Sequence, residues 1–115
     1  MAEQERLMQH GIALFNAGRF YESHEVLEEA WNRAPRAERF FLQSLVHCAV
    51  AWHHATHGNA DGAVLQTRRA LRKLAGYLPE HEGVDTRALH QRLSEWLEAW
   101  QRGAAAERAT IGVRP

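Results

Sequence analysis

The sequence predicts an all-α fold: a compact bundle of about five helices, built from antiparallel helical hairpins with tetratricopeptide-like spacing. Apolar residues recur at helical spacing in five stretches, no stretch alternates apolar and polar residues as a half-buried strand would, and β-branched residues are few. A chain of 115 residues, of which 45% are hydrophobic, is long enough for one domain with its own core. We therefore expect a single helical domain over residues 1–103 and a flexible C-terminal tail over residues 104–115, where no pattern is present.

The first two helices are expected on either side of a glycine. The first carries Leu7, Ile12 and Phe15 and ends before Gly18, because glycine commonly follows a helix C-terminus. The second ends near Pro35, and its glutamates lie outside an inner face of apolar and small side chains. That inner face consists of Phe20, Ser23, His24, Leu27, Ala30 and Trp31.

Three more helices are expected after the second. The third is apolar over most of its circumference, which indicates a central and largely enclosed position. It carries Phe40, Phe41, Leu45, Ala49, Val50 and Trp52. The fourth is expected to begin at Asn59 or Asp61, and the fifth at Asp85 or Thr86, since each can cap a helix N-terminus; Gly103 ends the fifth. The apolar side of the fifth helix comprises Leu89, Leu93, Trp96, Leu97 and Trp100.

A weak internal repeat supports the hairpin arrangement. The first copy has the small and aromatic residues of a tetratricopeptide-type helix pair, and a second copy follows 40 positions later. The copies are Gly11, Leu14, Gly18, Phe20, Ser23, Leu27, Ala30 and Pro35, and then Gly58, Ala60, Ala63, Thr67 and Ala70. A solenoid needs three or more repeats, so two imperfect copies favour a compact bundle.

Composition excludes several classes of function. The 14 basic and 14 acidic residues give a formal charge of zero, which argues against nucleic-acid binding. No apolar stretch approaches the roughly 20 residues of a membrane span, and the N-terminus is too polar for a signal peptide. The single cysteine, Cys48, excludes an internal disulfide and lies in an apolar run, so we expect a cytoplasmic protein with a buried, unreactive thiol.

The candidate site is the spacing His24-x-x-x-Glu28-x-x-Trp31 on the second helix. Side chains four positions apart share a helix face, so the imidazole and the carboxylate are expected to touch. Both are ligand types that suit a divalent metal such as zinc, manganese or iron. A metal needs at least a third ligand, and His47 and His54 on the third helix are the expected donors if the two helices are neighbours.

Two other interpretations use the same residues. In the first, His24 and Glu28 form a buried structural pair covered by Trp31, and the helical hairpins bind a protein partner or a second copy of the chain. In the second, Trp31 and Gln43 form the floor of a small-molecule pocket without metal. The glutamates of the second helix are also an obvious complement to the basic face of the fourth. No catalytic residue is predicted, and enzyme activity is left open.

Several histidines also have a simpler structural interpretation. His53, His54 and His57 lie near the end of the third helix, where they can stabilise its C-terminal dipole. His81 in a polar loop and His90 on the fifth helix are expected to face solvent.

Residues 14–31 resemble a small family of uncharacterised bacterial and archaeal proteins that is defined by an H-x-x-x-E-x-x-W/Y motif. The segments 41–45 and 58–63 resemble the family as well, and the similarity covers about residues 7–78. The resemblance implies an all-α fold and a motif suspected of metal binding, with no established activity.

The family motif carries over to this chain as His24, Glu28 and Trp31. The chain departs from the family pattern at His47 and Ser44, where the resemblance implies glutamine and glycine. The departure at position 47 therefore counts against a ligand role for His47, although its chemistry suits one.

Overall fold

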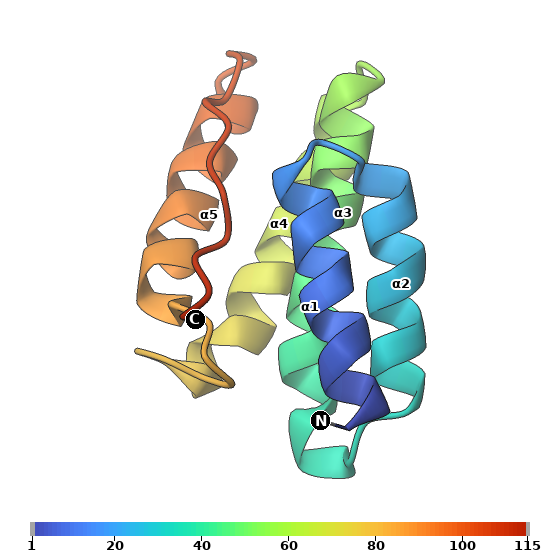
Figure 1. Ribbon diagram of the computed structural model, residues 1–115. Helices are drawn as coiled ribbons and strands as arrows, with labels where there is room; N and C mark the ends of the chain where they lie inside the picture. Colours follow the sequence, from blue (N-terminus) through green and yellow to red (C-terminus); the bar gives the residue numbers. More distant parts are fainter. Residues whose placement is uncertain (1, 115) are drawn as a thin grey trace.

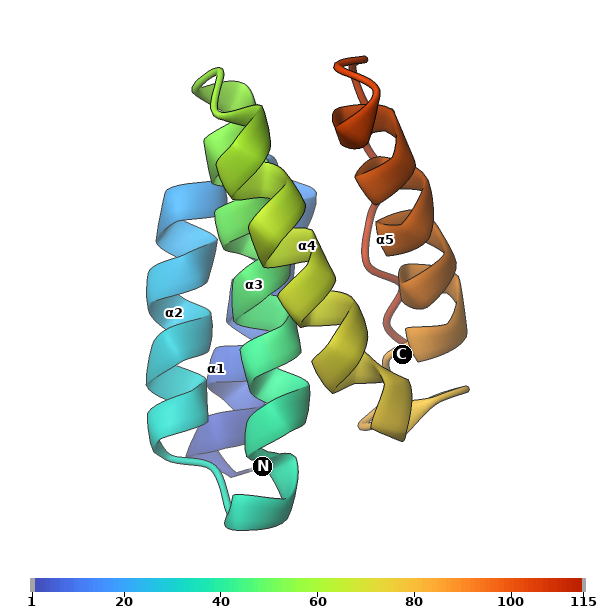
Figure 2. The same ribbon diagram turned by 180° about the vertical axis from the view of Figure 1, so that it is seen from behind.

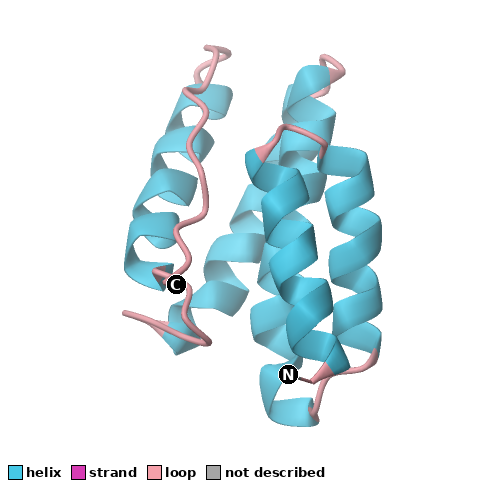
Figure 3. Ribbon diagram, viewed as in Figure 1, coloured by secondary structure: helices cyan, strands magenta, loops and turns pink. Residues whose placement is uncertain are grey.

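A computed structural model describes residues 2–114 and contains five α-helices and two short 3₁₀ helices in that range (Figures 1 and 3). The α-helices are α1 (Glu3–Asn16), α2 (Phe20–Asn32), α3 (Arg39–Thr56), α4 (Ala60–Leu74) and α5 (Thr86–Gln101), and the 3₁₀ helices are η1 (Arg36–Glu38) and η2 (Ala75–Tyr77). Two isolated β-bridges join His81 to Val84 and Val84 to Val113, and no strand forms among the described residues. The all-α prediction is confirmed.

The helices pack in chain order around α3 (Figures 1 and 2). Helices α1 and α2 form one hairpin, α3 and α4 form the second, α2 packs on α3, and α5 packs on α4. The central position predicted for the third helix is confirmed, because half of its 18 residues are buried. These are Phe41, Leu42, Ser44, Leu45, Val46, Cys48, Ala49, Ala51 and Trp52. None of the helices within residues 2–114 has the length and hydropathy of a transmembrane span.

The hairpins meet through small residues. Gly11 of α1 lies so close to α2 that a Cβ there would be 2.5 Å from the Cγ of the fully buried Leu27. The hydroxyl of the buried Ser23 donates to the Gly11 carbonyl at 2.7 Å. This contact gives a buried polar group its partner and sets the spacing between the two helices.

The internal repeat has a structural counterpart. Gly18 and Gly58 both adopt left-handed backbone, with φ of 82° and 74°, and a helix begins two residues after each. Three pairs of positions 40 residues apart are buried on the inner faces of α2 and α4, whereas in a fourth pair Phe20 is buried and Ala60 is exposed. The buried pairs are Ser23 with Ala63, Leu27 with Thr67, and Ala30 with Ala70. The two hairpins therefore use the same turn and the same small-residue face.

Two of the predicted caps are present. Asn59 accepts a hydrogen bond from the Gly62 amide at 2.9 Å at the start of α4, and Asp85 accepts one from the Ala88 amide at 3.0 Å at the start of α5. Each cap satisfies an amide that has no partner within its helix.

The tryptophans of α3 and α5 form an aromatic core. Trp52 packs edge-on against Trp96 and Trp100, with ring centroids 5.3 and 5.1 Å apart, and stacks on Phe20 at 5.6 Å. All three tryptophans are buried, as expected. Cys48 of α3 is fully buried, and burial raises the pKa of its thiol to about 12, which makes it unreactive.

The C-terminal segment lies against the bundle between α5 and α1 (Figure 1), a position that differs from the free tail expected for residues 104–115. The Asn16 side chain donates to the Ile111 carbonyl at 3.1 Å and accepts from its amide at 2.7 Å. The Trp96 indole donates to the Glu107 carbonyl at 2.8 Å, and Ile111 is buried. These few contacts hold the segment in place. They do not recur at helical spacing, so the sequence pattern could not predict them.

We expect Gly11→Ala to lower the free energy of unfolding by about 1–3 kcal/mol, because the new methyl group overpacks against Leu27. The matched control is Gly76→Ala, since no heavy atom lies within 4 Å of a Cβ at that position and its φ is not positive. The control should stay within about 0.5 kcal/mol of wild type in urea unfolding. Equal losses in both variants would show that the α1–α2 contact is not close.

Candidate functional site

The motif residues lie in a row along α2. The His24 Nε2 is 3.6 Å from a Glu28 carboxylate oxygen, which is beyond hydrogen-bond distance, and the His24 Nδ1–H donates to the Tyr21 carbonyl at 3.2 Å. The His24 side chain is 24% exposed and that of Glu28 is 49% exposed. An ion pair with so much exposure contributes little to stability, so the pair is not the buried structural pair on which the protein-interaction interpretation depends.

Trp31 continues the row and forms one wall of a pocket between α2, α3 and α4. The pocket has a volume of about 100 Å³, and it also has Gln43, Val46 and His47 of α3 and Lys73 of α4 in its lining. Trp31 and Gln43, the two residues expected to floor a pocket, thus line the same cavity. Lys73, which the sequence analysis did not assign to the site, comes from a third helix and is the only lysine in the chain.

A chain of hydrogen bonds holds Lys73 at this pocket. The His47 Nδ1–H donates to the Gln66 side-chain oxygen at 2.7 Å, which leaves Nε2 free to accept from the Lys73 ammonium at 3.0 Å. This arrangement requires a neutral imidazole. Burial lowers the pKa of His47, and the positive charges of Lys73, Arg69 and Arg72 lower it further, against the opposing effect of the bond to Gln66.

Lys73 is itself a cation in an unfavourable setting. Partial burial lowers the pKa of its ammonium, and Arg72 and Arg69 lower it further. Within residues 2–114, none of the ion pairs includes any of these three cations. The side of the pocket formed by α4 therefore carries positive charge without an acidic partner.

The glutamates of α2 do not supply that partner. Glu22 pairs with Arg19 at 2.6 Å and Glu29 pairs with Arg33 at 3.4 Å, and these arginines directly precede and follow α2. Within residues 2–114, no ion pair joins the acidic face of α2 to the basic face of α4, so the complement expected from the sequence does not form in this part of the chain.

His54, the fourth expected metal ligand, lies at the turn between α3 and α4. Its Nδ1 accepts from the Asn59 amide nitrogen at 3.3 Å, and its ring packs so closely on Gly62 that a Cβ there would be 2.9 Å away. His47 and His54 are therefore bonded to residues of α4 or its cap, while His24 and Glu28 pair on α2. His53 directly precedes His54 on α3. Partial burial lowers the pKa of His53, and the neighbouring histidines lower it further.

A different group brings three metal-ligating side chains together, and it is the only such group within residues 2–114. Glu38, His81 and Glu82 have ligand atoms that all lie within 4.8 Å of one another. His81 does not face solvent as expected, because its Nε2 is bonded to a Glu38 oxygen at 2.6 Å. Burial raises the pKa of Glu82, and the charge of Glu38 adds to this effect. Glu38 and His81 are separated by 43 positions in the sequence, so no local motif indicates this group.

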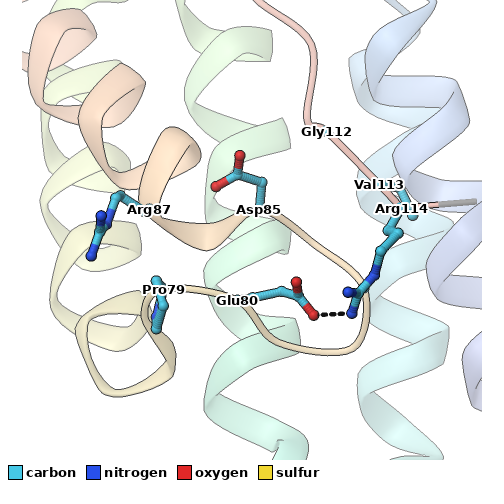
Figure 4. A pocket seen from close by; sticks show the side chains of 8 residues that line it. Pro79, Glu80, Asp85, Arg87, Gly112, Val113 and Arg114 are labelled. Atoms are coloured by element: carbon cyan, nitrogen blue, oxygen red, sulfur yellow. Dashed lines mark hydrogen bonds and ion pairs between the residues drawn. The ribbon is translucent and has the colours of Figure 1, made fainter.

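A wider surface hollow of about 570 Å³ lies between the loop before α5 and the C-terminal segment (Figure 4). An ion pair between Arg114 and Glu80 spans one side of it, so part of its charge is already neutralised. Its lining consists of Pro79, Glu80, Gly83, Asp85, Arg87, Gly112, Val113 and Arg114. The ion pair and the cap that Asp85 forms on α5 engage three of its four charged side chains, so this hollow is the weaker candidate.

Comparison with known proteins places the chain in a family. The family described as a domain of unknown function (DUF309) matches residues 8–65, half of the chain, and the protein belongs to this family. The chain is also 26% identical, over 98 residues, to an uncharacterised protein of Aquifex aeolicus (strain VF5). That match covers 84% of this chain and 29% of the relative, so the chain spans less than a third of the relative's length. The resemblance to an uncharacterised family is confirmed.

We expect His47→Gln to weaken the dependence of stability on acid. Because the pKa of His47 is lowered in the folded protein, the unfolded chain takes up its proton first as the pH falls, and the folded state loses stability from about pH 6.5 downward. The measurement is urea unfolding at pH 7.5 and pH 5.0. The loss of unfolding free energy between the two should be smaller in the variant than in wild type. An equal loss would contradict a buried, neutral His47.

Proposed function

We propose that the protein binds a small, negatively charged organic ligand in the pocket between α2, α3 and α4. The observation that supports this most is the Lys73 ammonium, which is partly buried, is held by His47 and has no acidic partner among the described residues. A cation that is partly removed from water is unfavourable unless an anion pairs with it. Binding of a carboxylate at Lys73 would therefore be favourable.

The neighbouring charges strengthen the preference for an anion. Arg69 and Arg72 lie near enough to lower the pKa of both His47 and Lys73, so they add to the positive potential at the pocket. An incoming carboxylate would relieve this repulsion among the cations. Charge-assisted hydrogen bonds of this kind are about twice as strong as neutral ones.

The residues that line the pocket indicate the chemistry of the uncharged part of the ligand. Trp31 and Val46 offer apolar surface, and the Gln43 amide offers one polar contact. Beside them, a second hollow of about 460 Å³ also has Lys73 in its lining, together with Phe40, Arg72, Gly76 and Tyr77. Apolar walls with a few polar groups are typical of small-molecule sites. A planar carboxylic acid fits this combination, with its charge at Lys73 and its ring between the aromatic side chains.

The motif also supports a metal proposal, which concerns the exposed side of α2. His24 and Glu28 offer two donors, and a zinc, manganese or iron ion there would take its remaining ligands from water or from a bound molecule. His47 and His54 would have to leave their present hydrogen bonds to join them. The anion proposal needs no such rearrangement, and we therefore favour it.

The anion proposal is tested with Lys73→Met and the matched control Arg68→Met, which removes the same charge from α4 but is not among the cations that act on His47. Benzoate is the probe, and its neutral analogue benzamide is the second control. We expect benzoate to shift the amide resonances of Gln43 and His47 in an NMR titration. Its dissociation constant should rise about tenfold in Lys73→Met and change less than about twofold in Arg68→Met, since a charge-assisted bond is lost only in the first.

Two results would contradict anion binding at this pocket. One is an equal weakening in both variants, which would indicate a general effect of net charge. The other is binding of benzamide as tightly as benzoate, which would make the pocket an apolar site without a role for Lys73.

A second candidate function is association with another protein, and Phe40 supports it. Its side chain is 60% exposed at the edge of the hollow that contains Lys73, and the Lys73 Nζ lies 6.0 Å from the centre of its ring. A second copy of the chain could cover this aromatic surface and place one of its acidic side chains at Lys73. Sedimentation equilibrium should then show a dimer for wild type and a monomer for Phe40→Ser. A monomer in both cases would remove self-association.

A further inference from the structure

We infer that Glu38, His81 and Glu82 form a binding site for a divalent transition-metal ion of the zinc type. The His81 Nε2 and a Glu38 oxygen are 2.6 Å apart, and the Glu82 carboxylate lies with them within 4.8 Å. One imidazole nitrogen and two carboxylate oxygens are a donor set that zinc accepts, with water completing the sphere. None of the three residues lines the pocket at Lys73, so this site is independent of the proposed function.

The backbone around the donors is well anchored. Glu38 ends η1 directly before α3, while His81 and Glu82 lie in the loop between η2 and α5. Two backbone hydrogen bonds join His81 and Val84, at 3.1 and 2.8 Å, and Val84 is fully buried. The loop thus presents its donors from a fixed base to a residue that is more than 40 positions earlier in the chain.

The imidazole is held in place before any ion arrives. The His81 ring packs edge-on against Phe41 of α3 and against Tyr77 of η2, with ring centroids 4.6 and 4.7 Å apart. The Tyr77 hydroxyl in turn donates to the Ala37 carbonyl of η1 at 2.9 Å. This aromatic slot directs Nε2 toward Glu38, which is the orientation that a metal ligand needs.

Charge and exposure also suit a cation. The side chains of His81 and Glu38 are 25% and 18% exposed, so both are largely removed from water. Within residues 2–114, neither Glu38 nor Glu82 forms an ion pair with a lysine or arginine. Two carboxylates held beside a single imidazole leave a local negative charge that a divalent ion neutralises. Donors bonded to one zinc lie about 3–4 Å apart, so zinc binding requires the exposed Glu82 side chain to move inward slightly and the Glu38 oxygen to move away from the His81 Nε2, where coordination replaces their hydrogen bond.

The experiment is a zinc titration by calorimetry on the full chain, purified without an affinity tag and treated with a chelator. Glu82→Gln is the main variant, because the side chain is exposed and the substitution preserves its shape while removing its charge. Glu98→Gln on the exposed face of α5 is the matched control, and His24→Ala tests the motif. Thermal melts without metal check that each variant folds.

We expect wild type to bind one zinc ion at this site, with an affinity that falls about tenfold or more in Glu82→Gln and in Glu38→Gln, since each loses a first ligand. Glu98→Gln and His24→Ala should keep the wild-type affinity within about twofold. Cobalt should show visible absorption in wild type that is lost in Glu82→Gln. Unchanged zinc affinity in Glu82→Gln would overturn the inference, and loss of binding in His24→Ala alone would assign the metal to the motif instead.

Discussion

Enclosure of α3 between two hairpins is the constraint from which the other features of the structure follow. The helix is apolar on so much of its circumference that it must be covered by α2 on one side and by α4 on the other. Close contact in each hairpin is possible because the facing residues are small, as at Gly11 and Ser23. As a result, the polar side chains of Gln43 and His47 on α3 lie in the seam between helices, where they meet groups from α2 and α4.

The pocket at Lys73 is the chemical consequence of this packing. His47 leaves α3 toward α4 and is satisfied on both ring nitrogens, by Gln66 and by Lys73, so it holds an ammonium at the edge of an apolar cavity. Trp31 of α2 lines the same cavity. The family match ends at residue 65, and Gln66 and Lys73 lie beyond it. The cation thus comes from outside the segment that matches the family, whereas Trp31 lies within that segment.

The sequence predicted the features that depend on local patterns. Gly18 and Asn59 revealed a turn and a helix start, because each acts on backbone groups only a few residues away. It did not predict contacts that depend on how helices cross or loops fold back, such as His81 with Glu38 or Asn16 with Ile111. The candidate site was predicted in part. The sequence predicted that Trp31 and Gln43 share a pocket. It did not predict that Lys73 joins them, because Lys73 lies in a run of basic residues typical of an exposed helix face, and only the packing of α4 on α3 brings it to the pocket.

The most direct test of the central claim is an NMR titration of the Lys73 side chain, which can be assigned without ambiguity because the chain has no other lysine. A cation that lacks an anionic partner should titrate below the ordinary pKa of lysine, and addition of benzoate should raise that pKa. Titration at or above the ordinary value, with no response to benzoate, would mean that the ammonium is already neutralised or fully solvated, and the pocket would then have no preference for an anion.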